Sequence, residues 1–228
     1  MNPYKKQVLN AGEINLLDFI GGDLSIVNAA RVSFASQEEE LTDKSIGLIN
    51  YLLKNKHATP FEHVVFKFHV KCPIFIAREW FRHRWSSFNE MSMRYYVPES
   101  IDFYNPENIR QQIGKPGSYS FESIEDPITK SLVESKTKSV YSYAYNTYQV
   151  LIEAGVAKEI ARTVLPVGQY TEFIWTVNAR SLVNFISLRN DEHAQYEIRK
   201  YAEVVENIFS QYMPITHECF VKNGREAI

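Results

Sequence analysis

Two segments of the chain, residues 63–71 and 169–177, alternate apolar and polar side chains, and this pattern restricts the possible folds more than any other feature. The apolar face of the first segment is formed by Val64, Phe66, Phe68 and Val70. Such alternation is typical of a β-strand that covers a core with one face. Because the two strands are far apart in the sequence, the chain is predicted to build a sheet from distant segments.

Segments with helical spacing surround these strands. Asp23 or Ser25 can cap a first helix and Thr42 or Asp43 a second. The longest predicted helix extends over residues 126–155, Asn178 can cap another, and a further long helix is expected from about residue 192. No Gly-x-Gly-x-x-Gly motif occurs, which argues against a Rossmann domain. We therefore predict one domain, residues 1–228, of the α+β class, with helices packed around a mostly antiparallel sheet.

Residues 82–95 concentrate groups that bind anions. Three arginines, a histidine, an asparagine, a glutamate and three serines lie within this stretch. Arginine binds phosphate or carboxylate through a planar fork of donors, and hydroxyl and amide groups can hold the remaining oxygens. The stretch begins where a short helix after Pro73 should end, so we expect residues 85–90 to form a loop and residues 92–97 a returning strand. The pattern predicts a small phosphorylated ligand.

The charge balance separates this interpretation from nucleic-acid binding. The chain has 25 Lys and Arg against 27 Asp and Glu, with a pI of about 6.3. A nucleic-acid-binding domain is usually basic over a whole face. A solvated basic patch, or a weak RNA-binding patch, remains the alternative to a nucleotide site.

The histidines and cysteines do not predict a metal site or a disulfide framework. His57, His63 and His69 lack the spacing of a zinc site, so no metal is predicted. The two cysteines, Cys72 and Cys219, are too few and too far apart for a disulfide framework. Cys72 precedes the predicted helix after Pro73, where a thiol could be activated, but a buried structural thiol is the favoured reading.

Two further expectations concern the surface of the protein. No segment has the apolar length of a membrane span, and the N-terminus lacks the apolar core of a signal peptide, so a cytoplasmic protein is expected. Residues 101–123 are rich in Asn, Gln, Gly, Pro and Ser, which predicts a surface excursion with a turn at residues 115–118. Apolar residues on one side of the 126–155 helix should pack on the core or form an interface; they are Ile128, Leu132, Val140, Ala144, Tyr148 and Leu151.

The arginine-rich stretch resembles the signature of the flavin-dependent thymidylate synthases. The matching positions are Arg82, His83, Arg84, Ser87, Asn89, Ser92 and Arg94. Further blocks at residues 29–34, 57–63, 164–166 and 175–182 resemble the family in the same order, and the resemblance is thinnest over residues 101–135. It implies an enzyme that makes dTMP from dUMP with FAD, NADPH and methylene-tetrahydrofolate, as a homotetramer whose flavin lies between subunits.

The resemblance also implies roles for individual residues. The FAD-binding set would be His57, Thr59, Arg82, His83, Arg84, Glu90, Asn178, Arg180, Asn184 and His193. The dUMP-binding set would be Glu79, Arg82, Glu90, Met91, Ser92, Met93, Arg94, Arg162 and Arg189. Arg189 resembles the arginine that polarises the uracil ring and is the predicted catalytic residue.

One position departs from the family pattern. Glu79 stands where relatives often carry a glutamine that contacts dUMP, and a carboxylate there would repel phosphate but could accept from sugar hydroxyls. Two alternatives to the synthase are a nucleotide- or RNA-binding module without turnover and a metal-dependent nucleotide hydrolase. The sequence leaves the folate-site residues and the choice between NADPH and NADH open.

Overall fold

A five-stranded antiparallel sheet forms the centre of the protein. The computed structural model describes residues 5–115 and 118–228. The sheet order is β1-β2-β3-β7-β4, and every neighbouring pair is antiparallel. The strands are β1 Lys5–Val8, β2 Gly12–Ile20, β3 Val65–Pro73, β7 Tyr170–Asn178 and β4 Ser86–Glu90. The predicted α+β class and the two predicted strands are confirmed, because β3 and β7 pair along their full length.

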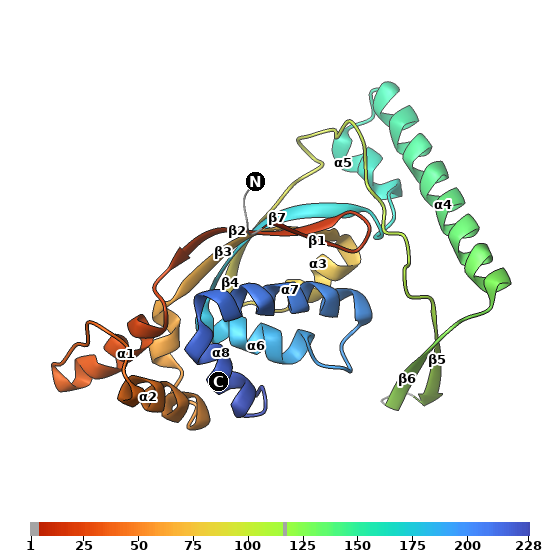
Figure 1. Ribbon diagram of the computed structural model, residues 1–228. Helices are drawn as coiled ribbons and strands as arrows, with labels where there is room; N and C mark the ends of the chain where they lie inside the picture. The colour runs from red at the N-terminus through yellow and green to blue at the C-terminus, as the bar shows by residue number, and fades with distance from the viewer. Residues whose placement is uncertain (1–4, 116–117) are drawn as a thin grey trace.

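Three helices cover one face of the sheet, α3 Ile74–Trp80, α6 Ala179–Arg189 and α7 Tyr196–Tyr212 (Figure 1). A fourth, α8 Pro214–Lys222, packs against α7 and α2 Asp43–Lys54. The apolar face predicted for β3 is buried beneath the first three, with Phe66 and Phe68 fully covered. Trp80 of α3 packs edge-on against Trp175 of β7, with ring centroids 5.2 Å apart. Burial of this aromatic cluster therefore joins the distant segments of the chain.

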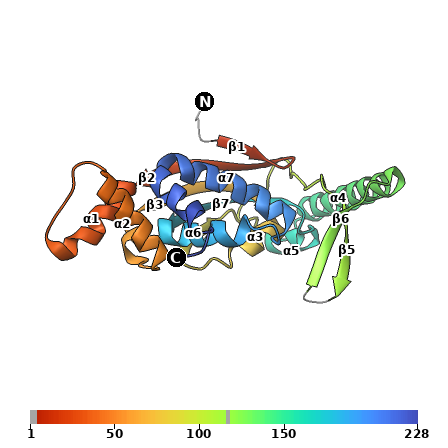
Figure 2. The same cartoon turned by 60° about the horizontal axis from the view of Figure 1, so that its bottom comes forward.

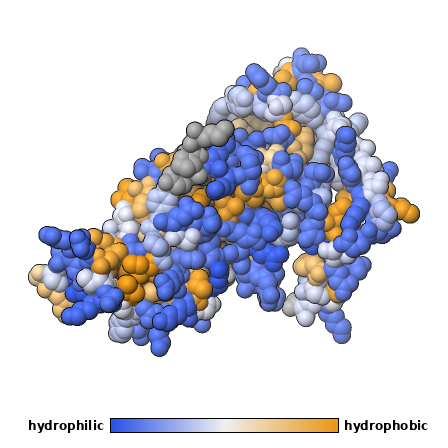
Figure 3. Space-filling view, in the orientation of Figure 1, coloured by the Kyte–Doolittle hydropathy of each residue, from blue (hydrophilic) through white to orange (hydrophobic). Residues whose placement is uncertain are grey.

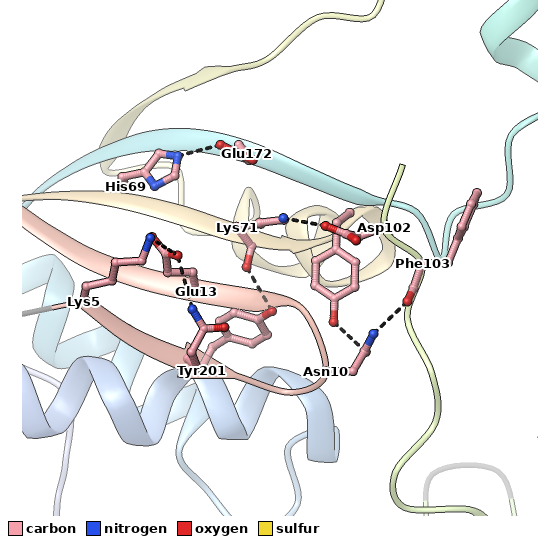
Figure 4. A network of polar contacts seen from close by, with 11 residues as sticks. Lys5, Asn10, Glu13, His69, Lys71, Asp102, Phe103, Glu172 and Tyr201 are labelled. Atoms are coloured by element: carbon pink, nitrogen blue, oxygen red, sulfur yellow. Dashed lines mark hydrogen bonds and ion pairs between the residues drawn. The ribbon is translucent and has the colours of Figure 1, made fainter. Parts of the chain in front are cut away.

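The other face of the sheet carries polar and charged side chains. Figure 4 shows ion pairs along this face, between His69 and Glu172 and between Lys71 and Asp102. The distances are 2.9 Å for His69 Nε2 to Glu172 Oε2 and 2.7 Å for Lys71 Nζ to Asp102 Oδ2. Tyr201 of α7 lies in the core on the helix-covered side of the sheet and donates to the carbonyl of Lys71 over 3.0 Å. A side chain at Gly12 would overlap its hydroxyl, so only glycine fits there.

Two helices form one end of the molecule (Figure 2). They are α1 Asp23–Arg31 and α2 Asp43–Lys54. A short 3₁₀ helix follows each of them: η1 Val32–Phe34 comes after α1, and η2 Thr59–His63 comes after α2. Thr42 caps α2 as predicted, since its hydroxyl accepts from the backbone N–H of Ser45. The cap predicted for α1 is wrong: Gly22 occupies the N-cap position. The carboxylate of Asp23 accepts from the backbone N–H groups of Ile215 and Thr216 instead, and so caps α8.

The opposite end consists of an arm that stands away from the sheet (Figures 1 and 2). It contains the hairpin β5 Arg110–Lys115 and β6 Ser118–Ser123, the long helix α4 Pro127–Glu153, the short helix α5 Lys158–Ala161 and the 3₁₀ helix η3 Arg162–Val164. The long helix is confirmed, and Asp126 caps it by accepting from the backbone N–H of Thr129. Its predicted apolar side is only partly packed: Ala144 and Tyr148 are buried, but Ile128 is 78% exposed. Part of the turn predicted at residues 115–118 lies outside the described residues.

Two local predictions around the arginine-rich stretch are wrong. Residues 86–90 form strand β4 rather than a loop, because their backbone pairs with β7 from Ser86 opposite Val177 to Glu90 opposite Phe173. Residues 92–97 form turns and irregular structure rather than a strand. The polar side chains of β4 concealed the strand, since the hydrogen bonds that hold it come from a partner far away in the sequence. Among the described helices, none has the length and apolarity needed to cross a membrane.

Candidate active site

The paired strands β4 and β7 have a cavity at each end. Ser86, Val177 and Asn178 belong to the first cavity, at the start of β4 and the end of β7. Glu90, Thr171 and Gln169 belong to the second, at the end of β4 and the start of β7. The pairing of these two strands therefore fixes the positions of the two cavities relative to each other.

The first cavity has a volume of about 500 Å³ and collects most of the predicted FAD residues. Its walls include Arg82, His83, Arg84, Trp85, Asn178, Arg180, Asn184 and Arg189. Three elements supply them: the connection between α3 and β4, the end of β7, and α6. Asn178 caps α6 as predicted, because its side chain accepts from the backbone N–H of Ser181. This places Arg180 and Asn184 on the side of α6 that faces the cavity.

Arg189 is held by three acceptors. Its Nε donates to Nε2 of His83 over 2.9 Å, and its Nη1 lies 3.3 Å from Oε2 of Glu79. Its Nη2 donates to the backbone carbonyl of Glu79 over 3.2 Å. A guanidinium fixed in this way loses little rotational freedom when it meets a ligand.

The contacts of Arg189 also set the protonation of its neighbours. Burial, and secondarily the charge of Arg189, lower the pKa of His83 to about 4. The imidazole is therefore neutral at pH 7, which suits its role as an acceptor. Burial raises the pKa of Glu79, and the charge of Arg189 opposes that rise.

The donor set of the first cavity fits a flavin dinucleotide. Arg82 and Arg84 are exposed and, within the described residues, make no ion pair, so both are available to phosphate oxygens. The N-terminus of α6 adds backbone N–H groups and a favourable dipole for an anion. Trp85 and Leu188 offer aromatic and apolar surface for a ring system. Arg180 is paired with Glu62, which lines the same cavity and limits its free positive charge.

The second cavity has a volume of about 420 Å³ and collects four predicted dUMP residues. These are Glu90, Met91, Met93 and Arg162. Arg78 of α3 adds a second cation, while Ile74, Phe81, Leu165 and Val167 form apolar walls. The hydroxyl of Thr171 donates to Oε1 of Glu90 over 2.7 Å and so orients the carboxylate.

Six predicted site residues are not among those that line either cavity: His57, Thr59, Glu79, Ser92, Arg94 and His193. Arg94 is 3.6 Å from Glu159 on the surface, and His193 forms a local contact with Asp191. His57 lies at the connection that follows α2, edge-on to Tyr51. The roles predicted for these residues stay predictions.

Sequence reasoning missed several cavity residues. Glu62 belongs to the block at residues 57–63, but its ion pair with Arg180 depends on tertiary contact. Gln169 and Thr171 lie in a strand predicted from its alternation, and their position beside Glu90 follows only from the pairing of β7 with β4. Within residues 5–115 and 118–228, no group of His, Cys, Asp and Glu side chains has the arrangement to hold a metal ion.

Comparison with known proteins agrees with this geometry. The family described as "Thymidylate synthase complementing protein" matches residues 15–215. A flavin-dependent thymidylate synthase from Thermosipho melanesiensis is 47% identical over 216 residues, covering 95% of this chain and 93% of the relative. One from Thermotoga neapolitana is 47% identical over 218 residues, covering 96% and 94%. The structure of the UMP/dUMP methylase PolB from Streptomyces cacaoi, bound with 5-Br UMP, superposes with a TM-score of 0.87 at 36% identity, covering 98% of this chain and 100% of PolB.

Proposed function

Because the chain belongs to the flavin-dependent thymidylate synthases, we propose that it converts dUMP to dTMP with FAD, NADPH and methylene-tetrahydrofolate. The proposal is supported chiefly by two cavities of different chemistry at the two ends of one strand pair. One holds arginines, amides and an aromatic surface, and the other holds Arg162 and Arg78 opposite a carboxylate. These fit a flavin dinucleotide and a nucleoside monophosphate, respectively.

Arg189 has the central chemical role in this proposal. Attack on uracil or hydride transfer to it places negative charge on the pyrimidine ring, and a fixed cation at the ring edge stabilises that charge. His83, Glu79 and the Glu79 carbonyl orient the guanidinium before substrate arrives. When bound, the flavin would supply hydride chemistry that no side chain of the protein can supply.

The protein needs no thiol nucleophile in this reaction. Cys72 is fully buried, and burial raises the pKa of its thiol well above the usual value. The negative charge of Glu90 raises the pKa of the Cys72 thiol further. A thiol without access to solvent and without a thiolate form near pH 7 cannot attack a nucleotide in either cavity.

The active form is proposed to be a homotetramer. His57, Thr59 and His193 are among the FAD residues implied by family resemblance, yet they line neither cavity of the single chain. Arg94 and Ser92, implied for dUMP, also lie outside. Association of subunits would bring such residues to a neighbouring subunit's cavity. We retain the expectation that the enzyme works in the cytoplasm as part of this proposal.

The purified protein gives a direct test. We expect a flavin absorption spectrum, or uptake of added FAD, together with dTMP formation from dUMP, NADPH and methylene-tetrahydrofolate. UMP should be assayed in parallel, because PolB is a UMP/dUMP methylase. NADH should be assayed as well, because the sequence leaves the choice between NADPH and NADH open. A protein that binds neither FAD nor dUMP would contradict the proposal.

Arg189→Ala separates binding from chemistry. The variant should retain flavin through the remaining arginines but lose about 10²–10³-fold in turnover, the typical cost of one donor to developing charge. Lys67→Ala is the control: it removes an exposed cation from the face of the sheet opposite the helices, and the variant should turn over normally. Nucleotide binding without turnover in the wild type would favour the binding-module alternative, and activity lost on addition of a chelator would favour a hydrolase.

A further inference from the structure

Gln169 is a buried amide in the wall of the second cavity that the family resemblance does not assign to any ligand. Gln169 is only 7% exposed, and it lines the cavity together with Glu90 and Arg162. We propose that Gln169 determines substrate specificity by accepting a hydrogen bond from the sugar 3′-hydroxyl of the bound nucleotide. This inference rests on the proposed function, because it identifies a contact within the same nucleotide site.

The backbone of Gln169 is fixed on both sides. Its carbonyl accepts from the N–H of Ile74 over 2.9 Å, and its N–H donates to the carbonyl of Pro166 over 3.1 Å. The residue directly precedes β7, whose next residues pair with β3. The side chain therefore starts from a rigid position at the wall of the cavity.

The side-chain amide, by contrast, is poorly satisfied. Its Nε2 donates only to the thioether sulfur of Met93, at 3.4 Å. Its Oε1 is buried and has no hydrogen-bond partner among the described residues. Sulfur is a weak acceptor, and a buried carbonyl without a partner destabilises the folded state. Buried polar atoms normally have partners, so this one indicates a missing ligand contact.

The amide can reach a ligand without rearrangement of the strand. The terminal torsion of a glutamine side chain is soft, so rotation exchanges the weak contact with Met93 for a contact inside the cavity. Nothing else on the side chain anchors it, since the single N–H to sulfur bond is its one hydrogen bond within residues 5–115 and 118–228.

The composition of the cavity indicates which ligand group meets Gln169. Arg162 and Arg78 are suited to the phosphate, which carries acceptors only and gives Gln169 Oε1 no donor. The uracil N–H is also a donor. The base is proposed to meet Arg189, which lines the first cavity, so it would point away from Gln169 in the second. The sugar lies between phosphate and base, and its hydroxyl is the remaining donor. Glu90, oriented by Thr171, provides a second acceptor beside it.

The test compares dUMP with its 3′-deoxy analogue, 2′,3′-dideoxyuridine monophosphate, on the FAD-loaded protein. Equilibrium dialysis or calorimetry gives both dissociation constants. The wild type should bind dUMP about tenfold more tightly than the analogue, as expected for one buried hydrogen bond. Gln169→Leu and Gln169→Met should bind dUMP about as weakly as the wild type binds the analogue. Their affinity for the analogue should equal that of the wild type.

Gln211→Leu is the matched control, because Gln211 is exposed near the end of α7 and far along the chain from the cavity. It should preserve the tenfold discrimination. Flavin uptake and the thermal midpoint establish that each variant is folded, and two substitutions of different shape guard against failure of one to fold. If the Gln169 variants still discriminate tenfold, or lose affinity equally for both nucleotides, Gln169 does not contact the hydroxyl, although dTMP formation would leave the proposed function intact. A wild type that binds no dUMP would overturn both.

Discussion

The burial of His83 beside the charge of Arg189 makes stability sensitive to pH. Because the pKa of His83 is lowered to about 4 in the folded protein and lies near 6.5 in the unfolded chain, the unfolded chain binds the extra proton between these values. The stability contributed by neutral His83 is therefore complete above pH 6.5 and is lost as the pH falls through about 4. After discounting for partial exposure to solvent, we expect a loss of about 1–2 kcal/mol.

The measurement is urea unfolding at pH 7 and at pH 4.5 of the wild type and of His83→Gln. Glutamine can accept from Arg189 Nε but does not titrate, so the variant should lose less stability on acidification. Glu79 acts in the opposite direction, since burial raises its pKa, and this contribution is common to both proteins. Equal losses in the two proteins would show that His83 is not the titrating group.

Replacement of the thiols addresses the chemistry at the residue scale. Cys72 and Cys219 are both buried, so alanine, which adds no polar atom, is the appropriate substitution. The double variant Cys72→Ala/Cys219→Ala should lose about 1–3 kcal/mol of stability through poorer packing and keep most of its dTMP-forming activity. Single-turnover rates on the folded, flavin-loaded variant measure this. A folded variant without turnover would assign the thiol a covalent role.

Substitution of Glu79 by glutamine tests how the carboxylate beside Arg189 affects binding and turnover. Glu79→Gln removes the charge beside Arg189 but keeps an acceptor and leaves the backbone carbonyl in place. Because the guanidinium would then be less neutralised, turnover should stay within about tenfold of the wild type while dUMP binds more tightly. Separate measurement of kcat and KM checks this, with Glu203→Gln on the exposed side of α7 as the control. Loss of turnover with unchanged binding would show that the carboxylate is required for the chemistry.

At the scale of elements, a buried ion pair attaches the hairpin to the body of the protein. Glu197 of α7 is 3% exposed and receives both terminal nitrogens of Arg110, at 3.0 and 2.8 Å, together with the hydroxyl of Tyr104 at 2.8 Å. The strands β5 and β6 are otherwise exposed along their length, apart from Arg110 itself. This base contact therefore holds an element that has little packing of its own.

Arg110→Ala should release the hairpin and leave the Glu197 carboxylate buried with fewer partners. We expect a loss of about 3 kcal/mol, at the lower end of the range for breaking one side of a buried pair, because Tyr104 and Gln195 still donate to Glu197. Hydrogen exchange should accelerate over residues 110–115 and 118–123 while β3 and β7 stay protected. Lys115→Ala removes a charge from the same hairpin without touching Glu197 and should leave exchange unchanged. Slow exchange in Arg110→Ala would mean that other contacts hold the hairpin.

The elements also show what could be predicted from sequence and what could not. β3 and β7 were predictable because Phe66, Phe68, Phe173 and Trp175 report a buried face through their spacing. β4 was not, because Ser86, Ser87 and Asn89 carry no such signal and the strand exists through its pairing with β7. The arginines of the first cavity follow from the motif, whereas Gln169 became visible only when the fold placed it beside Glu90.

At the scale of the whole molecule, the arm carries many exposed apolar side chains. Figure 3 shows apolar side chains on the surface at that end, among hydrophilic residues, as well as near α1 and α2. On α4, the exposed apolar residues are Ile128, Leu132, Val140, Tyr143 and Val150. A long helix with so few buried residues is expected to pack against another chain.

Light scattering should therefore give the mass of a tetramer for the wild type, about four times 26.5 kDa. Leu132→Glu should shift the protein toward smaller species and weaken FAD binding at the same time, because the proposed site needs more than one subunit. Lys136→Glu places the same charge on an exposed polar position of α4 and should retain the tetramer. An active monomer would contradict the assembly proposed here.

The pairing of β4 with β7 also limits how this chain can change in evolution. The five residues of β4 fix the spacing of the two cavities: at about 3.3 Å per residue, the two ends of the strand lie roughly 13 Å apart, and one cavity opens at each end. A residue inserted or deleted between Ser86 and Glu90 would turn the following side chains to the opposite face and move one site relative to the other. Variation in length should therefore be tolerated in the arm and in the α1–α2 connection, but not in this short strand.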